Sequence, residues 1–210
     1  MTQSRIAFIM DPIQDVAIVK DTTFAFMLAA QTRGHEVWYL ELPDMFVERA
    51  RAMCQGRRTE VRRQVGHHFN FVEEANLPLD HFDAIFMRKD PPFNVAYLHA
   101  TQLLDLAQEN GTIVLNRPAG LRAANEKLYA LNFPSVIPAT LISQDATQLK
   151  NFLVELGGEM IIKPVDGHGG AGIFYLKEED RNINSIIETM TKEGHEPIIA
   201  QQYIPEARQG

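Results

Sequence analysis

"KPVDGHGGAGIF", Lys163–Phe174, is the stretch that decides the fold of the second half of this chain. Four of the six residues from 167 to 172 are glycines: Gly167, Gly169, Gly170 and Gly172. Glycine is entropically costly in mid-chain, so this density indicates a special backbone path or a close approach to a ligand. Three of the four also spell G-x-G-x-x-G, the dinucleotide-binding pattern, so the residues that flank them decide the interpretation.

The flanking residues exclude the two common phosphate-binding motifs. A dinucleotide-binding fold needs a helix after the loop, but "GIFYLK" (Gly172–Lys177) is β-branched and aromatic and predicts a strand. A Walker A loop places its lysine after the glycines, whereas Lys163 precedes them. The sequence therefore predicts a hairpin with a glycine loop, in which backbone N–H groups and Lys163 face phosphate oxygens. The alternative is a hairpin turn without a ligand.

The segments around this hairpin predict a domain of mixed strands and helices. Strands are expected at residues 136–143, 159–165 and 197–204, and a helix at 145–157. Apolar residues at helical spacing predict one further helix that ends at Gly194; they are Ile183, Ile186, Ile187 and Met190.

The first half of the chain alternates strands and helices. Strands are expected at residues 5–10, 36–41, 83–88 and 112–116, with helices at 21–34, capped by Asp21 or Thr22, and around Ala100–Ala107. This alternation predicts an open parallel α/β domain at residues 1–122, followed by a second domain at 123–210. Residues 43–82 fit either strands or an irregular excursion.

The composition limits the class of protein. A formal net charge of −7 argues against general nucleic-acid binding, which needs a basic surface. No apolar run approaches the ~20 residues of a membrane span, and the apolar run at residues 5–10 is too short for a signal peptide. A single cysteine, Cys54, suggests a reducing compartment. We therefore expect a cytoplasmic protein with no membrane partner.

Several short motifs together resemble a known family. "NEKL" (125–128), the glycine stretch and "AQQYIP" (200–205) resemble the ATP-grasp ligases in order and spacing. "MDPI" (10–13), "KDTTFAFMLAAQTRGHEV" (20–37) and "MRKDPPFN" (87–94) look like the bacterial glutathione synthetase family of that superfamily. The resemblance covers essentially all 210 residues. It implies an N-terminal pre-ATP-grasp α/β domain followed by an incomplete ATP-grasp α+β domain.

The resemblance also implies roles for particular residues. The glycine loop would fold over the triphosphate, and residues near the end of the last strand would contact adenine. The implied ATP-binding residues are Lys127, Lys163, Asp166, Gly167, Gly169, Gly170, Gly172, Gln201, Gln202, Tyr203 and Ile204. The implied substrate-binding residues follow two strands of the first domain, where open α/β sheets place ligands: Asp11, Pro12, Arg88, Lys89 and Asp90.

The implied reaction is the ATP-dependent joining of γ-glutamylcysteine and glycine to form glutathione, through an acyl phosphate. Such chemistry needs positioning and charge stabilisation rather than a nucleophilic side chain, so no catalytic residue is assigned. ATP and Mg²⁺ are the implied cofactors, and a homo-oligomer is expected.

The sequence departs from the family pattern in its length. The family pattern predicts roughly another hundred residues, an ordinary addition for a domain, and these would carry the Mg²⁺ ligands. No metal ligand is therefore assigned in this chain, and by itself it is expected to be inactive. Two alternatives stay open: another ATP-grasp carboxylate–amine ligase, and a non-catalytic nucleotide-binding module.

Other polar features have simpler interpretations. The arginines at 57, 58, 62 and 63 predict a solvated face, with an anionic substrate or an oligomer contact as the alternative. Adjacent His67 and His68 are poorly spaced for one metal and are interpreted as surface or packing residues. Cys54 is expected to be an inert thiol. His168 either bonds a phosphate or points to solvent, and "DPPF" (90–93) is either a rigid turn or a substrate contact.

Overall fold

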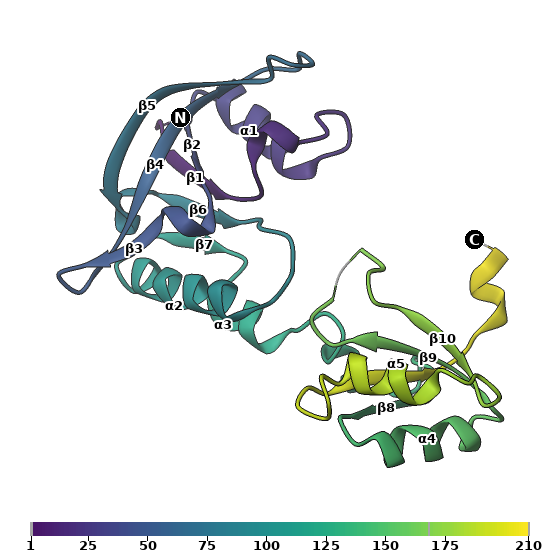
Figure 1. Cartoon of the computed structure of the whole chain (residues 1–210). Helices are drawn as coiled ribbons and strands as arrows, with labels where there is room; N and C mark the ends of the chain where they lie inside the picture. Colours follow the sequence, from purple (N-terminus) through teal and green to yellow (C-terminus); the bar gives the residue numbers. More distant parts are fainter. Residues whose placement is uncertain (1, 168, 210) are drawn as a thin grey trace. The chain divides into compact units, whose positions relative to one another are not determined.

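The computed structural model describes residues 2–167 and 169–209. The chain divides into two compact units, Met1–Ala124 and Asn125–Gly210, which are described separately below (Figure 1). No helix among the described residues is both long and apolar enough to cross a membrane.

Unit 1 is built on a seven-stranded mixed sheet. Its centre consists of parallel strands in the order β2 (Glu36–Leu40), β1 (Arg5–Ile9), β6 (Ala84–Met87) and β7 (Ile113–Leu115). The predicted parallel α/β arrangement is confirmed for these four strands. Beyond β2 the sheet continues with antiparallel strands, so the sheet as a whole is mixed.

The antiparallel extension is formed by the segment for which the sequence left two possibilities. Residues 43–82 form β3 (Met45–Glu48), β4 (Arg51–Val61) and β5 (Phe69–Pro78), and β4 pairs with β2, β3 and β5. A register shift between Arg58 and Thr59 interrupts the long β4–β5 ladder. The strand alternative is therefore the correct one, and the excursion belongs to the same sheet.

Two helices cover the parallel strands and bury both faces of the sheet. α1 (Thr22–Thr32) begins at Asp21, whose side chain accepts a hydrogen bond from the Phe24 N–H at 2.7 Å. α2 (Val95–Glu109) packs on the other face. Successive residues of β1, and Met10 directly after it, divide between two cores: Ala7 and Ile9 pack in the cluster with α2, and Phe8 and Met10 pack in the cluster with α1. A strand buried on both sides is typical of parallel sheets.

Two side chains of β4, Arg57 and Cys54, are packed into the sheet. Arg57 on β4 is half-buried, pairs with Asp44 and lies over the Tyr39 ring at 4.8 Å. The solvated-face prediction therefore holds for Arg62 and Arg63, which are exposed, and is wrong for Arg57, whose guanidinium is packed into the sheet. Cys54 is fully buried, and burial raises the pKa of its thiol to about 12, in keeping with an unreactive thiol.

Unit 2 contains a four-stranded antiparallel sheet in the order β10 (Phe174–Lys177), β9 (Glu159–Pro164), β11 (Ile198–Gln202) and β8 (Thr140–Ser143). Helices α4 (Ala146–Glu155) and α5 (Ile183–Met190) pack on one face of this sheet, against the side chains of Met160, Ile162 and Ala200. The short helix α3 (Pro118–Ala123) closes unit 1 before the chain enters unit 2. The predicted hairpin is confirmed, because β9 and β10 are antiparallel neighbours joined by the glycine loop.

Candidate functional site

The glycines of the β9–β10 loop are required for two different physical reasons. A Cβ atom on Gly167 would overlap with the Cγ atom of Pro164, and one on Gly172 would lie 3.2 Å from the Cδ atom of the same ring. Gly169 and Gly170 have open space around them but positive φ angles of 59° and 79°, which side chains rarely adopt. Gly167 and Gly172 therefore pack the loop base around Pro164, and Gly172, which has a positive φ of 72°, also allows the backbone to turn together with Gly169 and Gly170.

A cavity of about 200 Å³ lies at the base of this loop. Lys127 donates a hydrogen bond from Nζ to the Gly167 carbonyl oxygen and forms an ion pair with Glu126 at 3.1 Å. Lys163 is half-buried on β9, and burial together with the nearby Lys127 ammonium lowers its pKa. The residues that line the cavity are Glu126, Lys127, Lys163, Pro164, Gly167, Gly169, Gly170, Ala171 and Ile173. Two cations beside glycine backbone suit a phosphate-bearing ligand.

The lowered pKa of Lys163 makes anion binding pH-dependent. A bound phosphate favours the ammonium form, so it raises this pKa towards or above the ordinary value. At alkaline pH, where the free amine is partly deprotonated, ATP binding is expected to take up protons, and affinity should fall as pH rises through the free-state pKa. Isothermal titration over a series of alkaline pH values, in two buffers of different ionisation enthalpy, measures this uptake.

The matched control is Lys163→Arg, whose guanidinium stays charged throughout the accessible pH range. Proton uptake should be clearly smaller in this variant. Equal uptake in both proteins would show that another group, and not Lys163, titrates with binding.

The other residues assigned to ATP lie outside this cavity. β11 runs antiparallel to β9, with Ile199 opposite Lys163 and Gln201 opposite Ile161. Neighbouring register positions are ~3.3 Å apart, so residues 201–204 extend away from the glycine loop, and Gln201 lies on the sheet face that carries Lys163. Gln201 donates to the Thr140 hydroxyl at 2.8 Å, and the Tyr203 ring lies 4.5 Å from that of Tyr175. Gln202 and Ile204 are exposed.

Two further residues of the predicted loop need separate mention. Asp166 is exposed and does not line the cavity. His168 lies outside the described residues, so its predicted choice between phosphate and solvent stays a prediction. Sequence reasoning missed Pro164 and Ala171, although a proline directly after Lys163 with glycines three and eight positions later was a usable signal.

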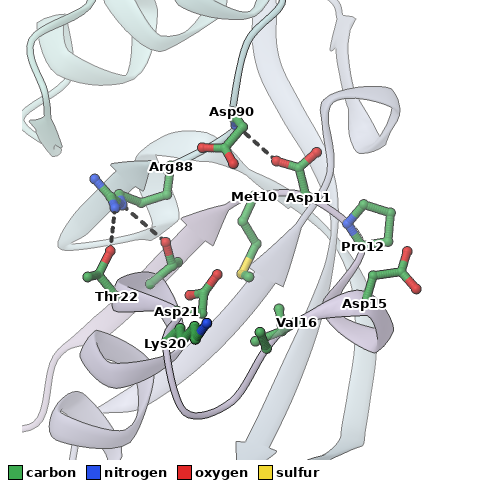
Figure 2. Close-up of a pocket in the computed structure, with 12 residues that line it drawn as sticks. Met10, Asp11, Pro12, Asp15, Val16, Lys20, Asp21, Thr22, Arg88 and Asp90 are labelled. Carbon is green, nitrogen blue, oxygen red and sulfur yellow. Dashed lines mark hydrogen bonds between the residues drawn. The ribbon is translucent and has the colours of Figure 1, made fainter. Parts of the chain in front are cut away.

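A second cavity, of about 400 Å³, lies in unit 1 beyond the ends of β1 and β6 (Figure 2). Four of the five residues predicted for substrate binding line it: Asp11, Pro12, Arg88 and Asp90. The other lining residues are Met10, Asp15, Val16, Ala17, Lys20, Asp21, Thr22 and Thr23. Because β1 and β6 are parallel neighbours, their carboxyl ends bring these distant segments together.

Arg88 is held in place by three contacts with its surroundings. Its backbone N–H donates to the Ile9 carbonyl at 2.7 Å, which continues the pairing of β6 with β1. Its guanidinium donates to the Thr22 hydroxyl at 2.8 Å and to the Thr23 hydroxyl at 3.1 Å (Figure 2). The guanidinium is therefore oriented at the N-terminus of α1, where the helix dipole also favours an anion.

Lys89, the fifth predicted substrate residue, does not line the cavity. Its ammonium instead pairs with Asp11 at 2.7 Å and donates to the Asp90 carbonyl at 2.7 Å. Asp11 also accepts the Asp90 N–H at 2.9 Å (Figure 2). Lys89 thus joins the two strand ends and orients Asp11.

The unit 1 cavity presents both signs of charge. Arg88 and Lys20 contribute cations, and Asp11, Asp15, Asp21 and Asp90 contribute carboxylates, of which Asp21 caps α1. A small zwitterion with a carboxylate and an ammonium group matches this arrangement. Sequence reasoning missed Asp15, which lies in the 3-10 helix Ile13–Asp15, and Lys20, which lies in the loop before α1, because neither directly follows a strand.

No group of three or more His, Cys, Asp or Glu side chains is placed to hold a metal ion within residues 2–167 and 169–209.

Two family models match consecutive parts of the chain. Residues 5–122 match "Prokaryotic glutathione synthetase, N-terminal domain", and residues 126–210 match "Prokaryotic glutathione synthetase, ATP-grasp domain". Curated glutathione synthetases from Coxiella burnetii and Escherichia coli K12 are 45% and 41% identical over 206 residues, which is 98% of this chain. The chain spans 64% and 65% of the length of these two relatives.

Solved structures with the same fold are more distant in sequence. A RimK domain protein ATP-grasp from Sphaerobacter thermophilus is 18% identical and has a TM-score of 0.62, over 96% of this chain and 65% of its own. Similarity at this level supports the ATP-grasp fold alone.

Proposed function

Because the chain belongs to the prokaryotic glutathione synthetase family, we propose that the protein joins γ-glutamylcysteine to glycine at the expense of ATP. The observation that carries this proposal is the match of both family models, in order, over residues 5–122 and 126–210. The reaction is proposed for the protein at the length of its relatives, and the 210-residue chain by itself is expected to be inactive. Its predicted cytoplasmic location and homo-oligomeric state stay predictions.

In the proposed reaction, the γ-phosphoryl group of ATP passes to the cysteinyl carboxylate of the dipeptide. The glycine amine then attacks the resulting acyl phosphate, which forms the peptide bond and releases phosphate, beside the ADP left from the first step. Neither transfer requires a covalent bond to the protein. The protein has to hold the reacting groups in line and stabilise their charge.

Unit 2 provides the proposed nucleotide site. Lys163 and Lys127 would neutralise phosphate oxygens, and the N–H groups of the glycine loop would bind the same oxygens. Residues 201–204 continue along the sheet face away from the loop, where the adenine base would lie. A glycine loop that covers the phosphates would also keep water from the acyl phosphate.

Unit 1 provides the proposed dipeptide site. The γ-glutamyl group carries both an α-carboxylate and an α-ammonium, so it matches the mixed charges of the unit 1 cavity. Arg88, fixed by Thr22 and Thr23, would bind the carboxylate. A carboxylate among Asp11, Asp15 and Asp90 would bind the ammonium. Mg²⁺ would neutralise phosphate charge when bound, through ligands that are not assigned among the described residues.

The proposal is tested with the full-length protein by measuring ADP release. Turnover is expected only when ATP, γ-glutamylcysteine, glycine and Mg²⁺ are all present. Replacing Arg88 with methionine should raise the KM for the dipeptide by about 10- to 100-fold, since a charged hydrogen bond contributes ~1.5–3 kcal/mol. The KM for ATP should stay within about twofold, because the nucleotide does not use this cavity.

Arg33→Met is the matched control, because Arg33 is an exposed arginine at the other end of α1. It should leave both KM values unchanged. Turnover with a different carboxylate or amine in place of these substrates would favour another ATP-grasp ligase. ATP binding without turnover under every substrate combination would favour a non-catalytic module.

A further inference from the structure

The wall of the unit 1 cavity is anchored at one residue, Ile13. Ile13 begins a short 3-10 helix, Ile13–Asp15, and its side chain is fully buried. Its backbone N–H donates to the Tyr39 hydroxyl at 3.2 Å, and its carbonyl lies 2.7 Å from Nε2 of His68. The same carbonyl also accepts the Val16 N–H at 3.4 Å. Side chains 26 and 55 residues away along the chain thus hold both polar groups of one loop residue.

Tyr39 is oriented for this contact by a second hydrogen bond. Its hydroxyl donates to Oε1 of Glu41 at 2.5 Å, which leaves an oxygen lone pair for the Ile13 N–H. Tyr39 is fully buried on β2, and burial raises its pKa, with the Glu41 hydrogen bond acting in the same direction. The hydroxyl therefore stays protonated and points its proton at the Glu41 carboxylate.

His68 approaches from the turn that joins β4 to β5. His68 is 7% exposed, and its ring packs edge-on against Phe24 at 5.7 Å and Phe69 at 5.1 Å, measured between ring centroids. Because a carbonyl oxygen only accepts hydrogen bonds, Nε2 has to be the nitrogen that carries the proton. His68 therefore donates to Ile13 and fixes its carbonyl from the side of the antiparallel extension.

The residues beside Ile13 are the ones that face the cavity. Asp11 and Pro12 precede it and Asp15 and Val16 follow it, and all four line the cavity. A shift of the Ile13 backbone would therefore move two carboxylates of the cavity together. We propose that Tyr39 and His68 are positioning residues for the dipeptide site, acting through Ile13. This inference rests on the proposed function for the identity of the dipeptide.

The test uses steady-state kinetics of the full-length protein with Tyr39→Phe and His68→Phe, which keep an aromatic ring at each position and remove the hydrogen bond. Each variant is expected to raise the KM for γ-glutamylcysteine about three- to tenfold, because a net hydrogen bond is lost. The KM for ATP should not change. His68→Gln restores an N–H donor and should recover at least half of the loss, on a logarithmic scale.

The matched control is Thr112→Val. The Thr112 hydroxyl is buried in unit 1 and donates to the Phe82 carbonyl at 2.9 Å, but Thr112 does not line the cavity. This variant should lower the melting temperature without changing the KM for the dipeptide. If Thr112→Val raised the KM for the dipeptide as much as the Tyr39 and His68 variants do, general destabilisation would explain all three changes, and the inference would be overturned.

Hydrogen exchange of residues 10–17 gives a readout that does not depend on activity. Exchange in this segment should be faster in Tyr39→Phe and His68→Phe than in Thr112→Val. Faster exchange with a raised dipeptide KM supports the inference, and an unchanged dipeptide KM in both variants overturns it. If the wild-type protein does not use γ-glutamylcysteine, the proposed function fails, and exchange still decides whether Tyr39 and His68 anchor the segment.

Discussion

Replacing Lys163 with alanine is expected to lower kcat/KM for ATP by about 100-fold in the full-length protein. A charge-assisted hydrogen bond contributes ~1.5–3 kcal/mol, and each 1.4 kcal/mol is about a factor of ten in rate. The upper part of that range applies here because Lys163 is half-buried, where charges are less screened than in water. The measurement is the initial rate of ADP release at several ATP concentrations.

Lys163 is a sharper target than Lys127 because of how the two ammonium groups are engaged. Lys127 already contacts the Gly167 carbonyl and Glu126. Among the residues that the structure describes, none forms a hydrogen bond or an ion pair with the Lys163 ammonium. Lys163 is therefore the cation with more to gain from a phosphate.

Lys177→Ala is the matched control for this experiment. Lys177 lies on the neighbouring strand β10, is exposed and pairs with Glu159 at 3.2 Å. Surface pairs of this kind contribute little, so its loss should change kcat/KM for ATP less than about threefold. If Lys163→Ala were equally mild, its assignment to the phosphate site would be wrong.

The second large effect is expected from Gly167→Ala. Its new methyl group would overlap with the Pro164 ring, so either the ring or the loop base has to move. Overpacking of this kind costs ~1–3 kcal/mol, and the loop is expected to lose its phosphate-binding geometry. We expect kcat/KM for ATP to fall by about tenfold or more, with a lower melting temperature.

A double variant separates this clash from other effects of the substitution. Pro164→Ala removes the ring that the new methyl group meets, so Pro164→Ala/Gly167→Ala should be less impaired than Gly167→Ala alone. Gly169→Ala is the comparison, since its Cβ meets no atom within 4 Å and its φ is positive. Its cost should be ~1–2 kcal/mol from the backbone conformation, and Pro164→Ala should not relieve it. If Pro164→Ala improved Gly167→Ala and Gly169→Ala equally, the clash with the Pro164 ring would not be what distinguishes Gly167 from Gly169.

The sequence predicted the elements whose signals are local. The β9–β10 hairpin followed from β-branched and aromatic residues on both sides of the glycines, and Asp21 marked the start of α1. β4 was not separable from an irregular segment, although its residues alternate between buried and exposed. Its buried positions include Ala52 and Gly56, which are weak strand formers. Gly56 lies against the Trp38 ring, and only the folded sheet brings these two residues together.

In the candidate sites, too, the sequence predicted the residues that have a local signal and missed those that depend on the folded chain. Arg88 and Asp11 were found because polar residues after parallel strands meet at one edge of a sheet. The position of Lys20 depends on the path of the loop before α1, for which the sequence has no periodic signal. The anchoring of Ile13 by Tyr39 and His68 could not be predicted either, because three separate segments have to meet. The functional roles of the site residues stay predictions.

The contact between Lys127 and the Gly167 carbonyl has a thermodynamic consequence. For any anion that uses Lys127, this carbonyl is a competitor tethered to the same chain and present at a high effective concentration. Binding is then an exchange of acceptors, and the measured affinity is lower than the intrinsic one by the fraction of molecules in which Lys127 is free. The same exchange frees the Gly167 carbonyl, so anion binding at Lys127 and release of the glycine loop from Lys127 are linked in one equilibrium.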